Sequence, residues 1–137
     1  PAGGCLLTDP GYARRVRDQM EKGSLDWDVG ELMKVGRHFR ISGFRIVVGR
    51  NQEDNSKLEG FVKKGFWRME VLGHPGPVTL VEKGAAEKVL EAAAELTVKY
   101  SDAPGENPEE VEVRKGRSRK VLLARGLQEK EARKLMV

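Results

Sequence analysis

Helical spacing of apolar residues predicts five helices in this chain. The clearest helix runs from Gly84 to Tyr100, where alanine, valine and leucine fill one face and glutamates fill the other, as in an amphipathic helix. An earlier helix is expected to begin at Asp9-Pro10, a capping acceptor followed by a residue suited to the first helical position, and to end at Gly23. Three shorter helices are expected over residues 24–35, 52–64 and 128–137.

Alternation of apolar and polar residues predicts three antiparallel hairpins. The pairs of strands are expected at residues 38–41 with 44–48, 67–71 with 78–81, and 111–113 with 121–124. Ser42-Gly43 is a two-residue turn, and residues 114–120 are expected to form a basic hairpin loop. Because short connections make neighbouring strands antiparallel, the order predicts an α+β fold, a mostly antiparallel sheet built from hairpins with helices packed on one face.

Positive charge is concentrated in two acid-free runs. The net charge of +4 and the pI near 9.3 are by themselves weak evidence for a nucleic-acid partner. The basic residues of the runs are Arg37, Arg40, Arg45 and Arg50 in the first, and Arg114, Lys115, Arg117, Arg119, Lys120 and Arg125 in the second. On the first hairpin one face is expected to be core and the other basic, and the two runs are expected to form one continuous surface. The alternative is that each run is merely a solvated loop or edge strand.

The sequence offers little that could perform catalysis on its own. The chain of 137 residues is about one domain, with two histidines and one cysteine. No zinc-ligand spacing and no glycine-rich phosphate loop is present, so we expect a non-catalytic chain without metal or cofactor. No apolar run reaches the roughly 20 residues that cross a bilayer, no signal peptide is visible, and a lone cysteine argues against secretion. A cytoplasmic protein without a membrane partner is therefore expected.

Five single residues need a structural interpretation weighed against a functional one. His38 is either a half-exposed strand histidine or a residue that stacks on a base or contacts phosphate. Trp67 fits a core position better than Phe66, which is the more exposed candidate for base stacking, a contact worth roughly 1–3 kcal/mol per base. Cys5 is either a small residue at a domain junction or a sulfur-carrying cysteine, since a thiolate is activated near a helix N-terminus. His74 is expected to be a turn residue.

The stretch from His38 to Val81 resembles the RNA-binding domain of the NFACT family. The resemblance rests on Phe44 to Asn51, Asn55, Trp67, Pro75-Gly76-Pro77-Val78, a helix ending in Tyr100-Ser101 and a basic strand pair, and it covers roughly residues 36–125. It implies an RNA-binding domain, with structured RNA, and tRNA in particular, held mainly through phosphates. The candidate nucleic-acid-binding residues are Arg37, His38, Arg40, Arg45, Arg50, Asn51, Arg117, Arg119 and Lys120.

Residues 1–8 resemble the tail of a PP-loop tRNA 2-thiouridylase-like catalytic domain. The division expected is a tail or linker at residues 1–9, a helical lead-in at 10–36 and the NFACT-like domain at 37–137. The chain would then be the C-terminal part of a tRNA-modifying protein, a tRNA sulfurtransferase in which Cys5 is the candidate catalytic residue and the upstream domain is a partner. The alternative function is a protein-interaction or scaffold module that docks the catalytic domain without touching RNA.

Overall fold

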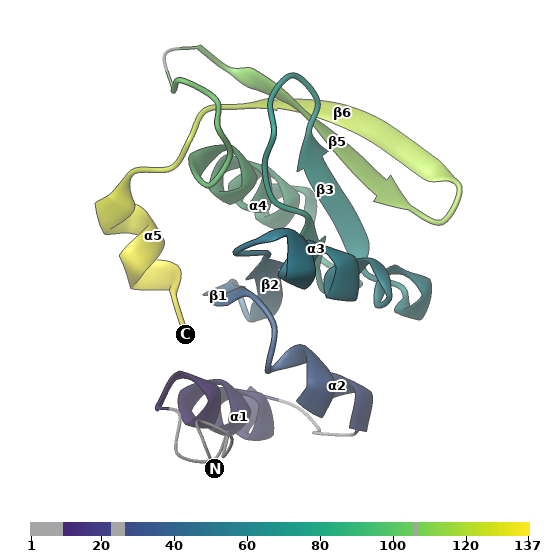
Figure 1. Ribbon diagram of the computed structural model, residues 1–137, viewed down its shortest axis with the longest axis vertical. Helices are drawn as coiled ribbons and strands as arrows, with labels where there is room; N and C mark the ends of the chain where they lie inside the picture. The colour runs from purple at the N-terminus through teal and green to yellow at the C-terminus, as the bar shows by residue number, and fades with distance from the viewer. Residues whose placement is uncertain (1–9, 23–26, 106) are drawn as a thin grey trace.

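A six-stranded antiparallel sheet forms the centre of the protein (Figure 1). The computed structural model describes residues 10–22, 27–105 and 107–137. In sheet order the strands are β1 (Arg37–Ile41), β2 (Phe44–Val48), β4 (Thr79–Val81), β3 (Trp67–Val71), β5 (Glu109–Lys115) and β6 (Ser118–Ala124). The helices are α1 (Pro10–Lys22), α2 (Trp27–Leu32), α3 (Gln52–Glu59), α4 (Glu87–Lys99) and α5 (Glu129–Leu135), with a 3-10 turn η2 (Val62–Lys64). The expected α+β class is therefore confirmed.

Helices α4 and α5 cover one face of the sheet. Ile46 and Val48 of β2 point to this face and are fully buried against α4 residues such as Leu90. Alternate residues of β3 and β5 extend the same apolar layer, with Met69 and Val113 also fully buried. This is the arrangement that the alternation of apolar residues predicts.

The opposite face is covered as well, which corrects the expectation that helices pack on one face only. Val47 and Leu80 point away from α4 into a second apolar cluster, with Leu58 of α3 and the residues after α2. The physical reason is visible in β2, where three consecutive apolar residues leave neither face polar, so both need cover. The β5–β6 part of this face is not covered in the same way, and Leu123 is 72% exposed there.

Two hairpin turns bring the strands together, and only the first was expected at its observed length. Ser42 and Gly43 both have positive φ, 51° and 86°, which is the geometry of a two-residue type I′ turn. The basic run 114–120 is not a loop, because β5 and β6 extend through it and turn at Gly116-Arg117. Strand pairing therefore continues through the pairs Arg114 with Arg119 and Lys115 with Ser118, residues that were expected to form a loop.

The strand register divides the sheet into two ends. Arg37 pairs with Val48, which pairs in turn with Thr79, so these residues lie at one end, which we call the pocket end. At the other end, the hairpin end, Trp67 pairs with Val81 and Lys115 pairs with Ser118. Helix α4 begins near the hairpin end, where Glu87 contacts Lys120.

Candidate nucleic-acid interface

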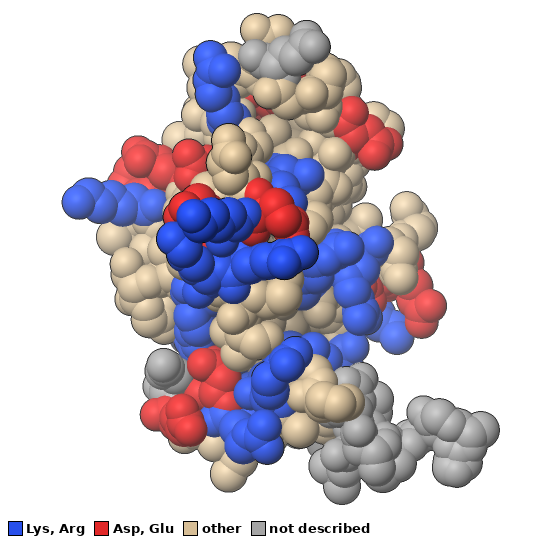
Figure 2. Space-filling model, turned by 90° about the vertical axis from the view of Figure 1, so that its left-hand side faces the viewer, with Lys and Arg blue, Asp and Glu red and all other residues tan. Residues whose placement is uncertain are grey.

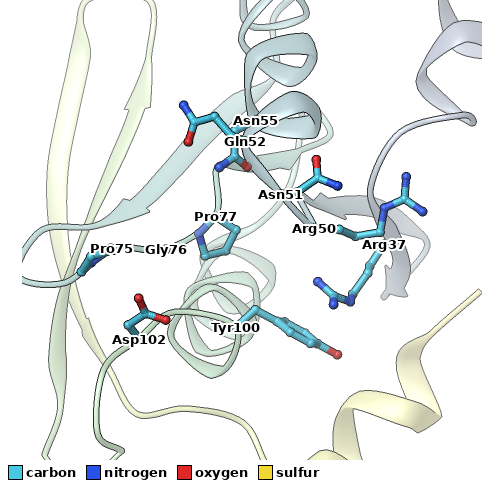
Figure 3. Close-up of a pocket in the computed structure, with 11 residues that line it drawn as sticks. Arg37, Arg50, Asn51, Gln52, Asn55, Pro75, Gly76, Pro77, Tyr100 and Asp102 are labelled. Atoms are coloured by element: carbon cyan, nitrogen blue, oxygen red, sulfur yellow. The ribbon is translucent and has the colours of Figure 1, made fainter.

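A pocket of about 240 Å³ opens at the pocket end of the sheet (Figure 3). Its walls come from four parts of the chain: Arg37 at the start of β1, residues 49–52 with Asn55, the turn 75–77, and Tyr100 with Asp102 after α4. Most of these side chains are polar. The segments that form the pocket are distant in sequence. They meet because β1, β2 and β4 each start or stop at the pocket end of the sheet.

Hydrogen bonds fix the segments of the pocket to one another. The Gly49 N–H donates to the Val78 carbonyl at 3.0 Å. The Val78 N–H in turn donates to Asn55 Oδ1 at 3.0 Å. The Asp102 N–H donates to the Pro75 carbonyl at 2.8 Å, which ties the end of α4 to the turn. A site whose walls are bonded in this way is formed before any ligand arrives.

Two glycines are required by this close packing. A Cβ on Gly49 would lie 2.0 Å from Asn55 Oδ1, far inside any van der Waals contact. A Cβ on Gly76 would lie 2.7 Å from the Cβ of Ser101. Only glycine lets the backbone approach so closely, so the walls depend on these two positions.

Tyr100 contacts two cations, of which Arg37 lines the pocket and Lys99 pairs with Glu129 at 2.7 Å. The Arg37 guanidinium carbon lies 4.4 Å from the centre of the Tyr100 ring, and Lys99 Nζ lies 4.7 Å from it. Figure 3 shows the Arg37 side chain reaching over Tyr100. Within the described residues Arg37 forms no ion pair, so the π-face of the ring is its stabilising contact. The result is a fixed positive charge beside the opening.

Arg50 and Asn51 shape the rim through Asp54. Arg50 Nε donates to Asp54 Oδ2 at 2.7 Å, and the backbone N–H of Arg50 donates to the same oxygen at 3.0 Å. Asn51 caps α3, with its Oδ1 accepting from the Asp54 N–H at 2.8 Å. Burial raises the pKa of Asp54, but the hydrogen bonds and charge of Arg50 outweigh it and hold the pKa below its usual value. Asp54 stays ionised and keeps the half-exposed Arg50 in place.

Figure 2 shows the side of the molecule that carries α5. Lysine and arginine side chains gather in a band across its middle, with acidic side chains among them. A basic band of this kind attracts a polyanion.

Three predicted site residues lie underneath α1 instead of on an open surface. His38 is 2% exposed, and its ring contacts the Val35 carbonyl at 2.8 Å and Arg45 Nη1 at 2.7 Å. Since an arginine has only donors, His38 Nδ1 accepts and Nε2–H donates. Burial first, and the charge of Arg45 second, lower the pKa of His38 well below its usual value, so the ring is neutral.

Asp18 of α1 neutralises the arginines of the first hairpin. Its carboxylate accepts from Arg45 Nη2 at 2.5 Å and from Arg40 Nε at 2.8 Å. Burial lowers the pKa of Arg45 to about 10, which still leaves it charged at neutral pH. The prediction that the polar face of this hairpin is an open basic surface is therefore wrong, because α1 packs on it with a complementary acid.

The second basic run lies at the other end of the sheet. Lys120 Nζ is 2.6 Å from Glu87, and Arg119 Nε is 2.5 Å from Glu112. Arg117 is exposed in the turn. Arg37 lies on β1 and this run lies on β5 and β6, at the opposite side of the sheet, and the acid-paired Arg40 and Arg45 do not connect them. The prediction of one continuous surface is wrong, and the two ends must be considered separately.

The remaining candidates have simpler positions. Phe66 is half-buried and packs on the second apolar cluster. His74 is half-buried and lies 3.3 Å from Glu109. Cys5 and the predicted division at residues 1–9 fall outside the described residues. Tyr100, which the sequence marked only as the end of the long helix, lines the pocket and had no predicted role in binding.

Neither a cluster of metal ligands nor a membrane-spanning helix occurs in the part of the chain that the structure describes. No group of three or more His, Cys, Asp or Glu side chains in residues 10–22, 27–105 and 107–137 is placed to hold a metal ion. None of the helices in that same part of the chain has the length and apolar character of a membrane span.

Comparison with known proteins identifies a family for most of the chain. A family model described as the NFACT protein RNA binding domain matches residues 36–136. Among solved structures, the C-terminal part of the fibronectin/fibrinogen-binding protein from Streptococcus suis is similar, with a TM-score of 0.64 and 18% identity. That alignment covers 98% of this chain but only 63% of the other, and at this identity it shows a shared fold alone. No curated protein sequence matches the chain.

Proposed function

The chain belongs to the family of NFACT protein RNA-binding domains, and from this premise we propose that it binds structured RNA, tRNA foremost, through its pocket end. The observation that carries the proposal is the prebuilt polar pocket with Arg37 held on Tyr100 at its rim. All of its walls lie within the residues that the family model matches. As a member of this family the domain is a binding module and not an enzyme.

The size and chemistry of the pocket suit one unpaired nucleotide of an RNA. About 240 Å³ is smaller than the roughly 300–1,000 Å³ of drug-sized sites, so the base or the ribose enters and the remainder stays outside. Asn51, Gln52 and Asp102 line the pocket and offer donors and acceptors for a base edge or a ribose hydroxyl. RNA is read mostly at unpaired nucleotides of this kind, while cations such as Arg37 hold the adjacent phosphates.

A binding titration tests the proposal. We expect a labelled tRNA to bind the chain with an affinity that falls steeply with salt, and Arg37→Gln to lower the affinity about tenfold, since a charge-assisted hydrogen bond is worth about 1.5–3 kcal/mol. The slope of log affinity against log salt should shrink by about 0.7–0.9 for the phosphate lost. Tyr100→Leu should have a similar effect, because it removes the ring under Arg37.

Arg114→Gln is the matched control for Arg37→Gln. It removes the same charge from an exposed side chain of β5, which three strands separate from β1, on the face away from α4 and 3.6 Å from Glu112. Equal losses for the two variants would show that the pocket is not the binding site. A salt-independent or absent interaction with tRNA would favour the scaffold function instead.

The larger protein is proposed to be a tRNA-modifying enzyme with a thiouridylase-like catalytic domain upstream. The support is the resemblance of residues 1–8 to the tail of such a domain. In the intact protein Cys5→Ser is expected to abolish thiolation while RNA affinity changes little. Full thiolation by that variant would reduce Cys5 to a structural residue.

A further inference from the structure

At the hairpin end of the sheet two lysines contact the Trp67 ring, and three further cations lie in the neighbouring segments. Lys115 Nζ and Lys120 Nζ lie 5.3 Å and 5.8 Å from the centre of the Trp67 ring. The three further cations lie in η2, after β4 and in the β5–β6 turn. We call this set the cationic end, and its members are Lys63, Lys83, Lys115, Arg117 and Lys120.

The strand order brings these residues together although they span more than fifty positions of the sequence. Lys63 precedes β3 by a few residues, and the side chain of Lys83 reaches to 3.5 Å from the Cβ position of Gly65. Trp67 pairs with Val81, which places the start of β3 beside the end of β4. Since β5 pairs with β3, the β5–β6 turn ends at this same edge.

The charge of the cationic end is largely uncompensated. In the part of the chain that the structure describes, Lys63, Lys83 and Arg117 form no ion pair, and all three are exposed. Lys120 alone has an acidic partner, Glu87, at 2.6 Å. Like charges held close together raise the local potential and attract a polyanion. Lys115 and Lys120 are held in position because both contact the Trp67 ring.

We propose that the cationic end is a second RNA-contacting surface, which holds the sugar-phosphate backbone of another segment of the RNA whose unpaired nucleotide fills the pocket. The inference rests on the proposed function. Helix α4 runs from Glu87, beside Lys120, to the residue before Tyr100 at the pocket, and at about 1.5 Å per residue its 13 residues put the two sites on the order of 20 Å apart. A short oligonucleotide therefore fills the pocket alone, whereas a folded RNA reaches both ends of the sheet.

The two ends of the sheet make different contacts with the RNA. The pocket end, with its amides and its small volume, selects an unpaired nucleotide. The cationic end carries side chains that contact phosphates without regard to sequence and adds affinity and orientation. A folded RNA that engages both ends gains the effect of a second, intramolecular contact, which no single-stranded tetranucleotide can provide.

Charge removal at the cationic end is the first arm of the test. Lys63→Gln with Arg117→Gln should weaken tRNA binding and reduce its salt slope by about 1.4–1.8, the share of two phosphates, yet leave the affinity for a tetranucleotide unchanged. The control is Lys57→Gln with Arg114→Gln, which removes the same charge from exposed residues of α3 and β5 that pair with Glu53 and Glu112. The control should bind tRNA as the unchanged chain does.

Fluorescence of Trp67 is the second arm. The chain has two tryptophans, so Trp27→Phe leaves Trp67 as the only one. Because Lys115 and Lys120 contact its ring, tRNA bound at the cationic end should change the emission, and a tetranucleotide in the pocket should not. Unchanged emission at saturating tRNA, with equal affinities for both double variants, would overturn the inference while the loss in Arg37→Gln still supports the pocket. Absence of any RNA binding by the unchanged chain would instead remove the proposed function.

Discussion

Gly49→Ala is expected to break the hydrogen bond that joins α3 to the wall of the pocket. The new methyl group would lie 2.0 Å from Asn55 Oδ1 and 3.2 Å from its Cγ. The Asn55 side chain must then move, and the Val78 N–H that donates to it at 3.0 Å loses its acceptor. Val78 is only 5% exposed, so water replaces the lost partner poorly.

The expected cost follows from that orphaned donor. A buried N–H without a partner costs about 1–3 kcal/mol, and a domain of this size loses on the order of 4 °C in Tm per kcal/mol. Circular dichroism melting should therefore show Tm for Gly49→Ala lowered by roughly 4–12 °C. Gly73→Ala is the control, because its Cβ would meet only Glu109 Oε1 at 4.0 Å, and it should melt within about 2 °C of the unchanged chain.

A double-mutant cycle identifies the residue that moves. Asn55→Ala removes the same acceptor and leaves room for the methyl group at position 49. If the mechanism is right, the double variant is no less stable than Asn55→Ala alone, and the two costs are strongly non-additive. Additive costs, or a Gly49→Ala protein that melts with the unchanged chain, would refute the reasoning.

Three further predictions concern α1, His38 and the turn beside the pocket. Asp18→Asn removes the acid that neutralises buried Arg45, so residues 10–22 should exchange amide hydrogens faster while the sheet keeps its protection; unchanged protection would contradict this. Because the pKa of His38 is lowered in the folded state, only the unfolded chain binds a proton at this histidine just below about pH 6.5. The free energy of unfolding in urea should therefore fall as the pH drops from about 6.5, by up to about 1.4 kcal/mol per pH unit. His38→Gln should flatten that slope. Gly76→Ala meets Ser101 Cβ at 2.7 Å and should weaken RNA binding more than Gly73→Ala does.

Local features of the fold could be predicted from sequence because short-range physics decides them. Ser42-Gly43 adopts positive φ as the two-residue turn requires. The helix predicted from Gly84 to Tyr100 forms as α4 over Glu87–Lys99, since its apolar stripe allows one buried face. Hairpin alternation also gave the correct inward residues of β2 and β3.

The candidate site was harder to predict, because it depends on strand order. Alternation shows which face a residue occupies, but not that β4 lies between β2 and β3. That order places the turn 75–77 beside Gly49 and makes the pocket. It also places Lys83 beside Gly65, at an end where the sequence had pointed only to the second basic run.

The arginines of the first hairpin show why an acid-free run in sequence does not define a basic surface in space. Arg37 and Arg45 belong to the same run, yet Arg37 lies on a tyrosine at the pocket rim and Arg45 is 3% exposed beneath α1. The difference is Asp18, an acid twenty-seven residues away that the fold brings within 2.5 Å. Lys63 and Lys83 show the converse, since each has glutamates a few positions away but none as an ion-pair partner within the described residues. A positive charge is most available to RNA where the folded chain offers it no acid, and this distinguishes Arg37, Lys63 and Arg117, which we propose contact RNA, from the buried and paired Arg45.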